Sequence, residues 1–276
     1  MLWLNSRWIE EGAAAVDPAD RGFLLADGLF ETIRAEGGRV RHLAAHLARL
    51  RDGAEVLGLR VPLPDDGIAA ALQATLAVNL LAEGAAALRL TLTRGPGPRG
   101  LLPAEPTRPT LMIAAFPLPA PRPPADAVLV EGVRRNERSP TSRLKTLAYL
   151  DQILALREAR AAGGDEAILR CTVGRLCCAS AGNLFLVMGG RIRTPPVEDG
   201  ALPGVTRRRL LAIRPSTGFD VTASPLPGEA MAAADEAFVT NSLAGIRPIR
   251  TLAGRVLPAP GPLTERLAAL LAADSG

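Results

Sequence analysis

Five prolines within ten residues, in the stretch PLPAPRPPAD at positions 117–126, most limit how this chain can fold. Proline fixes φ and lacks an N–H, so such a stretch is stiff and extended and joins neither a helix nor a central strand. A chain of 276 residues is also long enough for two domains. We therefore expect an N-terminal domain at 1–118, a linker at 119–126 and a C-terminal domain at 127–276.

Both parts of the chain mix strand-like and helix-like patterns. Alternating or continuous apolar runs predict strands at 1–10, 86–95, 109–118, 127–135, 166–170, 184–196 and 237–241, and ETIRAEGGRVRHL predicts two strands joined at Gly37-Gly38. Apolar residues at helical spacing predict helices at 42–59, 66–83, 146–162, 205–214 and 263–273. These patterns predict two α/β or α+β domains, with a site in the crevice between them.

Composition excludes several classes of function. The net charge is only +4, and the basic residues are scattered without interleaved aromatics, which argues against a nucleic-acid partner. Three cysteines, two of them adjacent, form neither a disulfide framework nor a zinc spacing, which fits the reducing cytoplasm. The sequence shows no signal peptide and no apolar run of membrane-spanning length. We expect a cytoplasmic protein with no membrane partner.

Lys145 is the only lysine, and the other 31 of the 32 basic residues are arginine. Arginine supplies positive charge equally well, but it cannot lose its proton near neutral pH and attack a carbonyl. A Schiff-base lysine needs that ability, so Lys145 is the candidate nucleophile, with chance survival of a surface lysine as the alternative. The only tyrosine, Tyr149, follows four residues later and shares a face with Lys145 if the segment is helical.

Two further segments could hold a phosphate group. LPGVTRRRL (202–210) places Pro-Gly and Thr206 at an expected helix start, where backbone N–H groups point outward. FVTNSLAGIRPI (238–249) ends a predicted strand at Asn-Ser. A plain capped helix and a plain turn are the alternatives.

Two apparent motifs do not support the function that they first suggest. RGPGPRG (94–100) matches G-x-G-x-x-G, but its prolines remove amide donors and no helix follows, so a loop whose Arg94 or Arg99 binds a carboxylate is the better interpretation. His42 and His46 are one helical turn apart but have no third ligand, so we predict no metal site and expect His46 to pack or cap.

Five segments, taken in order, resemble the class IV aminotransferases, which depend on pyridoxal 5′-phosphate. These segments are DRGFLLADGLFETIR (20–34), HLARL (46–50), LKTLAYLDQILALREARAAGGDEAIL (144–169), GRLCCASAGNLFLV (174–187) and TPPVEDGALPGVTRRRLL (194–211). The family contains branched-chain aminotransferases, D-amino-acid aminotransferases and aminodeoxychorismate lyases. The resemblance implies their two-domain α/β fold and a homodimer in which the partner's loops complete each site.

The resemblance also implies roles for individual residues. Lys145 would form the Schiff base with the cofactor, and Tyr149 would lie near its phenolic oxygen. Its phosphate would be held by residues from three segments: Arg49, Gly204, Val205, Thr206 and Ser242. Phe30 and Arg99 are the candidates for contact with the amino substrate.

The sequence departs from the family at Cys178. Members usually carry there a glutamate that keeps the pyridine nitrogen of the cofactor protonated, and no Asp or Glu occurs between Glu166 and Glu198. A thiol makes the ring a weaker electron sink. This favours an aminodeoxychorismate lyase, whose aromatic product supplies driving force, as do TRGPGPRG and NSLAGIRPIRTLAG. The alternatives are a branched-chain or D-amino-acid aminotransferase, and a relative with weak or no activity.

Overall fold

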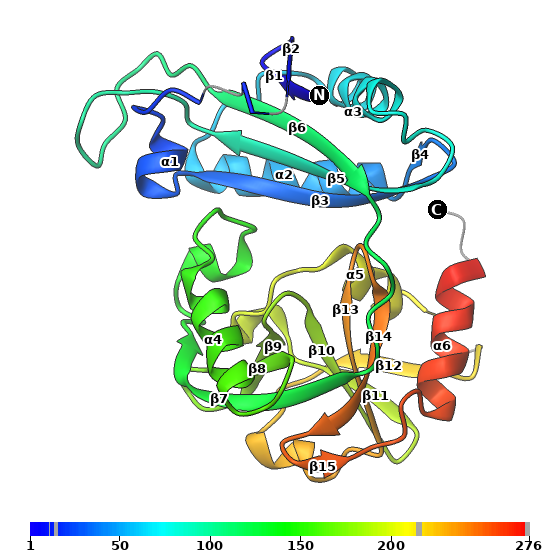
Figure 1. Ribbon diagram of the computed structural model, residues 1–276. Helices are drawn as coiled ribbons and strands as arrows, with labels where there is room; N and C mark the ends of the chain where they lie inside the picture. The colour runs from blue at the N-terminus through cyan, green and yellow to red at the C-terminus, as the bar shows by residue number, and fades with distance from the viewer. Residues whose placement is uncertain (11, 14–15, 214–216, 274–276) are drawn as a thin grey trace. The chain divides into compact units, whose positions relative to one another are not determined.

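The protein's structure is a computed structural model that describes residues 1–10, 12–13, 16–213 and 217–273. The chain divides into two compact units (Figure 1). The first unit comprises Met1–Ala120 and Lys145–Ala148, and the second comprises Pro121–Leu144 and Tyr149–Gly276. Each unit has its own sheet, so the mixed α/β fold predicted from the sequence is confirmed.

The first unit is a six-stranded antiparallel sheet in the order β2-β1-β6-β5-β3-β4. Its elements are β1 (Leu2–Leu4), β2 (Arg7–Ile9), α1 (Arg21–Leu25), β3 (Gly28–Glu36), β4 (Arg39–Val40), α2 (Leu43–Leu57), α3 (Asp65–Val78), β5 (Ala85–Thr93) and β6 (Thr110–Pro117). Helix α2 packs on β3 and α3 packs on β6, and each buries the apolar stripe that its sequence predicts.

The second unit is a mixed sheet in the order β12-β11-β10-β13-β14-β7-β8-β9, with β15 paired to β14. Its strands are β7 (Ala125–Arg135), β8 (Glu166–Cys171), β9 (Leu176–Ala179), β10 (Asn183–Met188), β11 (Arg191–Thr194), β12 (Asp220–Ala223), β13 (Glu236–Asn241), β14 (Gly245–Leu252) and β15 (Arg255–Val256). The helices α4 (Leu150–Ala161), α5 (Val205–Leu211) and α6 (Pro262–Ala273) pack on β7, β13 and β14, respectively.

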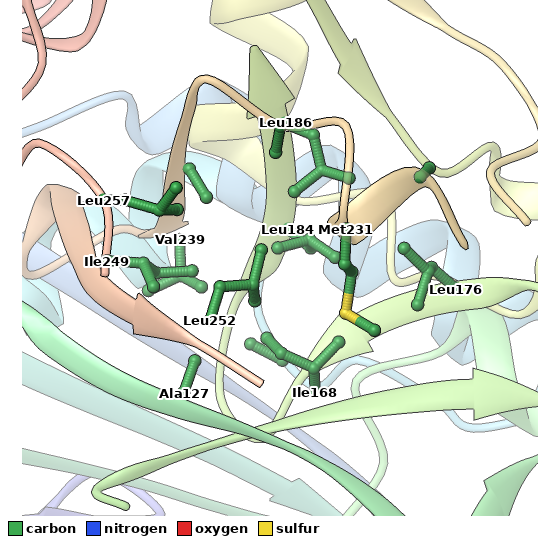
Figure 2. Close-up of a cluster of buried hydrophobic side chains, with 14 of the residues drawn as sticks. Ala127, Ile168, Leu176, Leu184, Leu186, Met231, Val239, Ile249, Leu252 and Leu257 are labelled. Atoms are coloured by element: carbon green, nitrogen blue, oxygen red, sulfur yellow. The ribbon is translucent and has the colours of Figure 1, made fainter. Parts of the chain in front are cut away.

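Aliphatic side chains from neighbouring strands fill the core of the second unit. Figure 2 shows one such cluster, in which the residues that carry labels are Ala127, Ile168, Leu176, Leu184, Leu186, Met231, Val239, Ile249, Leu252 and Leu257. All of these side chains are buried, and each of the larger ones, Ala127 excepted, contributes about 1.5–3 kcal/mol to folding when removed from water. Among the described helices, none is long and apolar enough to cross a bilayer.

Several predicted elements differ from the structure in their bounds. Residues 1–10 form two strands, β1 and β2, because Asn5 and Ser6 adopt positive φ and turn the chain. Residues 184–196 likewise form two strands, β10 and β11, around Gly189-Gly190, whose φ values are also positive. Helix α3 ends at Val78 rather than near residue 83, and α5 ends at Leu211. Residue 214, the last of the expected helix, lies outside the described residues.

The largest departure concerns the segment that contains Lys145. The predicted helix at 146–162 begins only at Leu150, and Lys145 to Ala148 are not helical. The start of β3 pairs with β5 on one side, and on its other side the Phe30 N–H donates to the Lys145 carbonyl while the Leu147 N–H donates to the Gly28 carbonyl. Because of this short antiparallel pairing, residues 146–148 are not helical although their sequence pattern predicts a helix. Lys145 therefore belongs to the first unit, whereas we predicted it in the C-terminal domain.

Candidate active site

The Lys145 side chain lies over the ring of Phe30. Its Nζ is 4.2 Å from the ring centroid, and the guanidinium carbon of Arg89 is 3.5 Å from the same centroid. Phe30 and Arg89 come from the paired strands β3 and β5, and the pairing of Lys145 with Phe30 brings the lysine to them. Both cations are therefore within cation–π distance of one aromatic ring.

This environment lowers the pKa of the Lys145 ammonium to about 8. Burial is the largest cause, and the positive charges of Arg49 and Arg89 add to it, while the negative charge of Glu31 opposes it. An amine with this pKa is partly neutral at physiological pH. Lys145 therefore has the property that a Schiff-base nucleophile requires.

A buried carboxylate organises the cations beside Lys145. Glu31 on β3 accepts hydrogen bonds from Arg49 through Nε at 2.8 Å and Nη2 at 2.6 Å, and its Oε2 is 2.7 Å from His46 Nδ1. Burial alone would raise the pKa of Glu31, but these hydrogen bonds and charges outweigh it and hold the pKa below its usual range. The bidentate pair fixes the plane of the Arg49 guanidinium.

The loop before α5 has the features of a phosphate-binding site. Gly204 precedes the helix, and a Cβ placed there would lie 2.1 Å from Asn183 Oδ1, so only glycine lets the chain enter α5 so close to β10. Asn183 also donates to the Leu202 carbonyl and thereby fixes the loop. The first N–H groups of α5, at Val205 and Thr206, have no acceptor within the helix. They are available to an anion.

Residues of β13 lie next to this loop. Thr240 pairs with Asn183 across β13 and β10, and its Oγ1 is buried with no hydrogen-bond partner in the described part of the chain. An orphaned buried hydroxyl is costly unless a ligand or water completes it. Half-buried Ser242 follows in a turn that Asn241 holds by accepting from the Leu243 and Ala244 N–H groups. The two segments predicted to hold phosphate therefore meet within the second unit.

Cys177 and Cys178 occupy a β-bulge in β9. Cys178 pairs with Leu169 of β8 and Leu176 pairs with Arg170, so Cys177 is the extra residue. Both thiols are buried, and a hydrogen bond between them raises the pKa of Cys177, an effect that burial reinforces. No carboxylate occupies the position that the resemblance assigns to the glutamate of the family.

The remaining predicted residues have different surroundings. Tyr149 is half-buried and precedes α4, so the helical spacing that would set it beside Lys145 is absent. Arg99 is exposed in the loop between β5 and β6. Arg94, the alternative in that loop, is buried instead and binds Asp27 and the carbonyls of Leu57 and Gly58, which is a structural role.

Sequence reasoning missed three residues of this site. Glu31 and Arg89 were not singled out, although both lie in strands that the sequence predicts, and a carboxylate one residue after Phe30 was the available signal. Arg21 was also missed, and it holds the Arg99 loop by donating to the carbonyls of Gly100 and Leu101. Its position in DRGF, within the first family segment, was the signal for it.

The lowered pKa of Lys145 can be measured directly, because the chain has only one other kind of amine, its N-terminus. In cofactor-free protein, the rate at which an amine-directed reagent modifies Lys145 should rise with a midpoint at about pH 8. The variant Glu31→Gln should lower this midpoint, since the Glu31 charge favours the ammonium form. Protein unfolded in urea is the control, with a midpoint near the ordinary value of 10.5. A midpoint above 10 in the folded protein would contradict the assignment.

Removal of the buried carboxylate should destabilise the first unit. Glu31→Gln removes the negative charge and one of the two oxygens that bind Arg49 and His46, so the largely buried Arg49 loses its counter-ion. The loss should be about 3–5 kcal/mol of unfolding free energy, measured by urea titration. Glu36→Gln, which breaks an exposed pair with Arg34, is the matched control and should cost at most ~1 kcal/mol. The pKa of Glu31 is lower in the folded state than in the unfolded state. The contribution of Glu31 to the unfolding free energy is therefore fully present above its unfolded-state pKa and is lost as the pH falls through its folded-state pKa. Equal losses for both variants would refute this account.

Comparisons with known proteins agree with these features. The profile of the family described as amino-transferase class IV matches residues 28–252. A protein of Methanocaldococcus jannaschii, provisionally named a branched-chain-amino-acid aminotransferase, is 36% identical over 93% of this chain and 89% of its own. The structure of the Escherichia coli branched-chain amino acid aminotransferase superposes with a TM-score of 0.92 at 26% identity, covering 99% of this chain and 94% of that one.

The 4-amino-4-deoxychorismate lyase of Pseudomonas aeruginosa superposes with a TM-score of 0.85 at 32% identity, and the match covers 99% of both chains. Both aminotransferases and a lyase are thus among the similar proteins, and the family match covers most of the chain. The chain belongs to the class IV aminotransferase family, whose enzymes depend on pyridoxal 5′-phosphate.

Proposed function

We propose that this enzyme is a 4-amino-4-deoxychorismate lyase, which converts its substrate to 4-aminobenzoate and pyruvate. The observation that carries this proposal is Cys178, at the position where the resemblance assigns a glutamate. The similarity of the chain to the Pseudomonas aeruginosa lyase along its whole length supports it.

The residues present fit pyridoxal phosphate. Arg49, the backbone N–H groups of Val205 and Thr206, and the hydroxyl groups of Thr206 and Ser242 are the proposed phosphate ligands. The close approach of Gly204 to Asn183 and the orphaned Thr240 hydroxyl support a bound group at this loop. Lys145 is the proposed attachment point, because its lowered pKa suits a nucleophile. When bound, the cofactor withdraws electrons from the carbon that loses a proton.

Lys145 also has the position and pKa to move protons. In the protein without cofactor its amine has a pKa of about 8, so Lys145 would be able to accept and return a proton near neutral pH. An amine of this kind removes the ring proton of the substrate and can return a proton to the departing three-carbon group, which leaves as pyruvate. Phe30 packs under Lys145 and excludes water from that side. Arg99, with Arg21 holding its loop, is the proposed partner of a substrate carboxylate.

The absence of a carboxylate at position 178 affects the two possible reactions differently. Transamination needs a strong electron sink, because charge must stay on the cofactor until a proton returns there. Elimination of pyruvate creates an aromatic ring, so the product supplies much of the driving force. A weak sink therefore handicaps transamination more than elimination, and this difference supports the lyase.

An aminotransferase that acts on a branched-chain or D-amino acid is the second candidate. The similarity to the Methanocaldococcus jannaschii protein and to the Escherichia coli structure favours it. Arg89 beside Lys145 and Phe30 offers a second cation for a substrate carboxylate, which either class of substrate carries. The two candidates differ in whether a 2-oxo acid is needed as the acceptor.

A turnover assay separates them. The purified enzyme with pyridoxal phosphate should release pyruvate from 4-amino-4-deoxychorismate without any added 2-oxo acid. Lys145→Ala should lower kcat by about 10²–10⁴-fold, because it removes the general base, and Lys145→Arg should not restore it. Amino transfer from a panel of amino acids to 2-oxoglutarate at the faster rate would instead establish the aminotransferase. No turnover in either assay would indicate a relative without activity.

We also propose that the enzyme is a homodimer. Five apolar side chains are exposed on helix α1 and on the loop whose Leu101 carbonyl accepts from Arg21. Two of them, Leu101 and Leu102, are 84% and 88% exposed. The other three are Phe23, Leu24 and Leu25. Exposed apolar side chains on two segments that are joined in this way are typical of a surface that another chain covers.

The patch can be tested by light scattering. The wild type should have the mass of two chains, and Leu101→Asp with Leu102→Asp should shift it toward one chain, since two charges would be buried. Leu80→Asp, at an equally exposed leucine in another part of the first unit, is the matched control and should leave the mass unchanged. A wild type of one chain at all concentrations would rule out the homodimer.

A further inference from the structure

Arg135 lies on the same face of the second-unit sheet as the two adjacent cysteines. It is the last residue of β7 and pairs with Cys171 of β8. Val133, two residues earlier, packs against the cluster that contains Cys177 and Cys178. Residues two apart on a strand point to the same face, so the Arg135 side chain is directed toward that cluster.

Arg135 also contacts the segment that leads to the phosphate-binding loop. A Cβ placed on Gly200 would lie 3.5 Å from the Arg135 Cβ, so the two backbones are in close contact. Ala201 belongs to the same cluster as Cys178, and the chain continues from it to Gly204 at the start of α5. Arg135 thus lies beside the cluster that contains Cys178 and beside the segment that leads to the phosphate-binding loop.

The guanidinium of Arg135 is only partly satisfied. Its Nη2 donates to the Ser142 carbonyl at 2.6 Å, three residues before Lys145, while its Nε is buried without a hydrogen-bond partner in the described part of the chain. No carboxylate there forms an ion pair with it. Glu166, whose negative charge raises the pKa of the Cys178 thiol, already accepts hydrogen bonds from the Ser180 hydroxyl and N–H. A buried guanidinium N–H of this kind is costly unless an acceptor completes it.

Electrostatics agree with this placement. The hydrogen bond from Cys177 is the largest cause of the lowered pKa of the Cys178 thiol, and the positive charge of Arg135 lowers it further. Arg135 therefore acts within electrostatic reach of the position where the family has its carboxylate.

We propose that Arg135 replaces this carboxylate and donates a hydrogen bond to the pyridine nitrogen of bound pyridoxal phosphate, which stays unprotonated. This inference rests on the cofactor of the proposed function and names the group that sets its electronic character. A guanidinium can only donate, so its partner must offer a lone pair. A protonated nitrogen would instead face a second positive charge. An unprotonated pyridine nitrogen bound by Arg135 would then be the reason why the cofactor is a weak electron sink in this enzyme.

The protonation state can be read from the holoenzyme without any substrate. With cofactor labelled with ¹⁵N in the ring, the wild type at neutral pH should give the resonance of an unprotonated pyridine nitrogen. Arg135→Gln should move it toward the protonated position and raise the Kd of the cofactor by about 2- to 10-fold, the loss of one hydrogen bond. Arg135→Lys, which keeps a cationic donor, should retain the wild-type resonance.

Two further variants complete the test. Arg134→Gln is the matched control, because the neighbouring arginine binds Glu131 instead, and its resonance should equal the wild type. The double variant Arg135→Gln with Cys178→Glu should give a fully protonated nitrogen, since it restores the carboxylate and removes the competing cation. If Arg135→Gln alone folds poorly, the resonance of the double variant still tests the proposal.

The outcomes are decisive for Arg135. A protonated nitrogen in the wild type, equal resonances for Arg135→Gln and Arg134→Gln, or a wild type that binds no pyridoxal phosphate would each overturn the inference. An Arg135-dependent resonance in an enzyme that releases no pyruvate would uphold the inference and reject the lyase alone. The protonation state and the release of pyruvate therefore test the two proposals separately, and only a wild type that binds no pyridoxal phosphate would reject both.

Discussion

The pairing of residues 145–147 with the start of β3 determines where the reactive amine lies. The Phe30 N–H donates to the Lys145 carbonyl and the Leu147 N–H donates to the Gly28 carbonyl, and these two bonds hold the segment against β3. β5 occupies one side of β3, and β4 reaches only the far end of its other side, so the beginning of the strand has open hydrogen-bonding groups for this segment. Without this pairing the local sequence would favour a longer α4, and the lysine would face a different environment.

That environment is built from charges that compensate one another. Glu31 binds Arg49 and His46, while burial and, to a smaller degree, the positive charges of Arg49 and Arg89 lower the pKa of Lys145 to about 8. A chain that uses arginine at nearly every basic position can bury these cations, because guanidinium groups form bidentate pairs and tolerate desolvation better than ammonium groups. Among Arg49, Arg89 and Lys145, only the lysine can become neutral near physiological pH.

Much of this arrangement could be predicted from the sequence, but the connections between its parts could not. Apolar periodicity located α2, β5 and β6 to within a few residues, and the replacement of lysine by arginine singled out Lys145. The strand β14 was not predicted because Pro248 lies within it, and proline lacks the backbone N–H that a strand usually donates. The sequence does not show that no N–H is needed at this position. Glu31, His46 and Arg49 are separated by up to 18 residues, so their shared buried site depends on the packing of α2 on β3.

The assignment of Lys145–Ala148 to the first unit has a consequence for how the protein is made. The first unit is discontinuous, since Pro121–Leu144 belongs to the second unit. During synthesis the six strands of the first sheet leave the ribosome well before the segment that completes the edge of β3, and β7 must emerge in between. A fragment that ended at the proline-rich segment would therefore contain a whole sheet and a buried counter-ion network, but not the amine that the network serves.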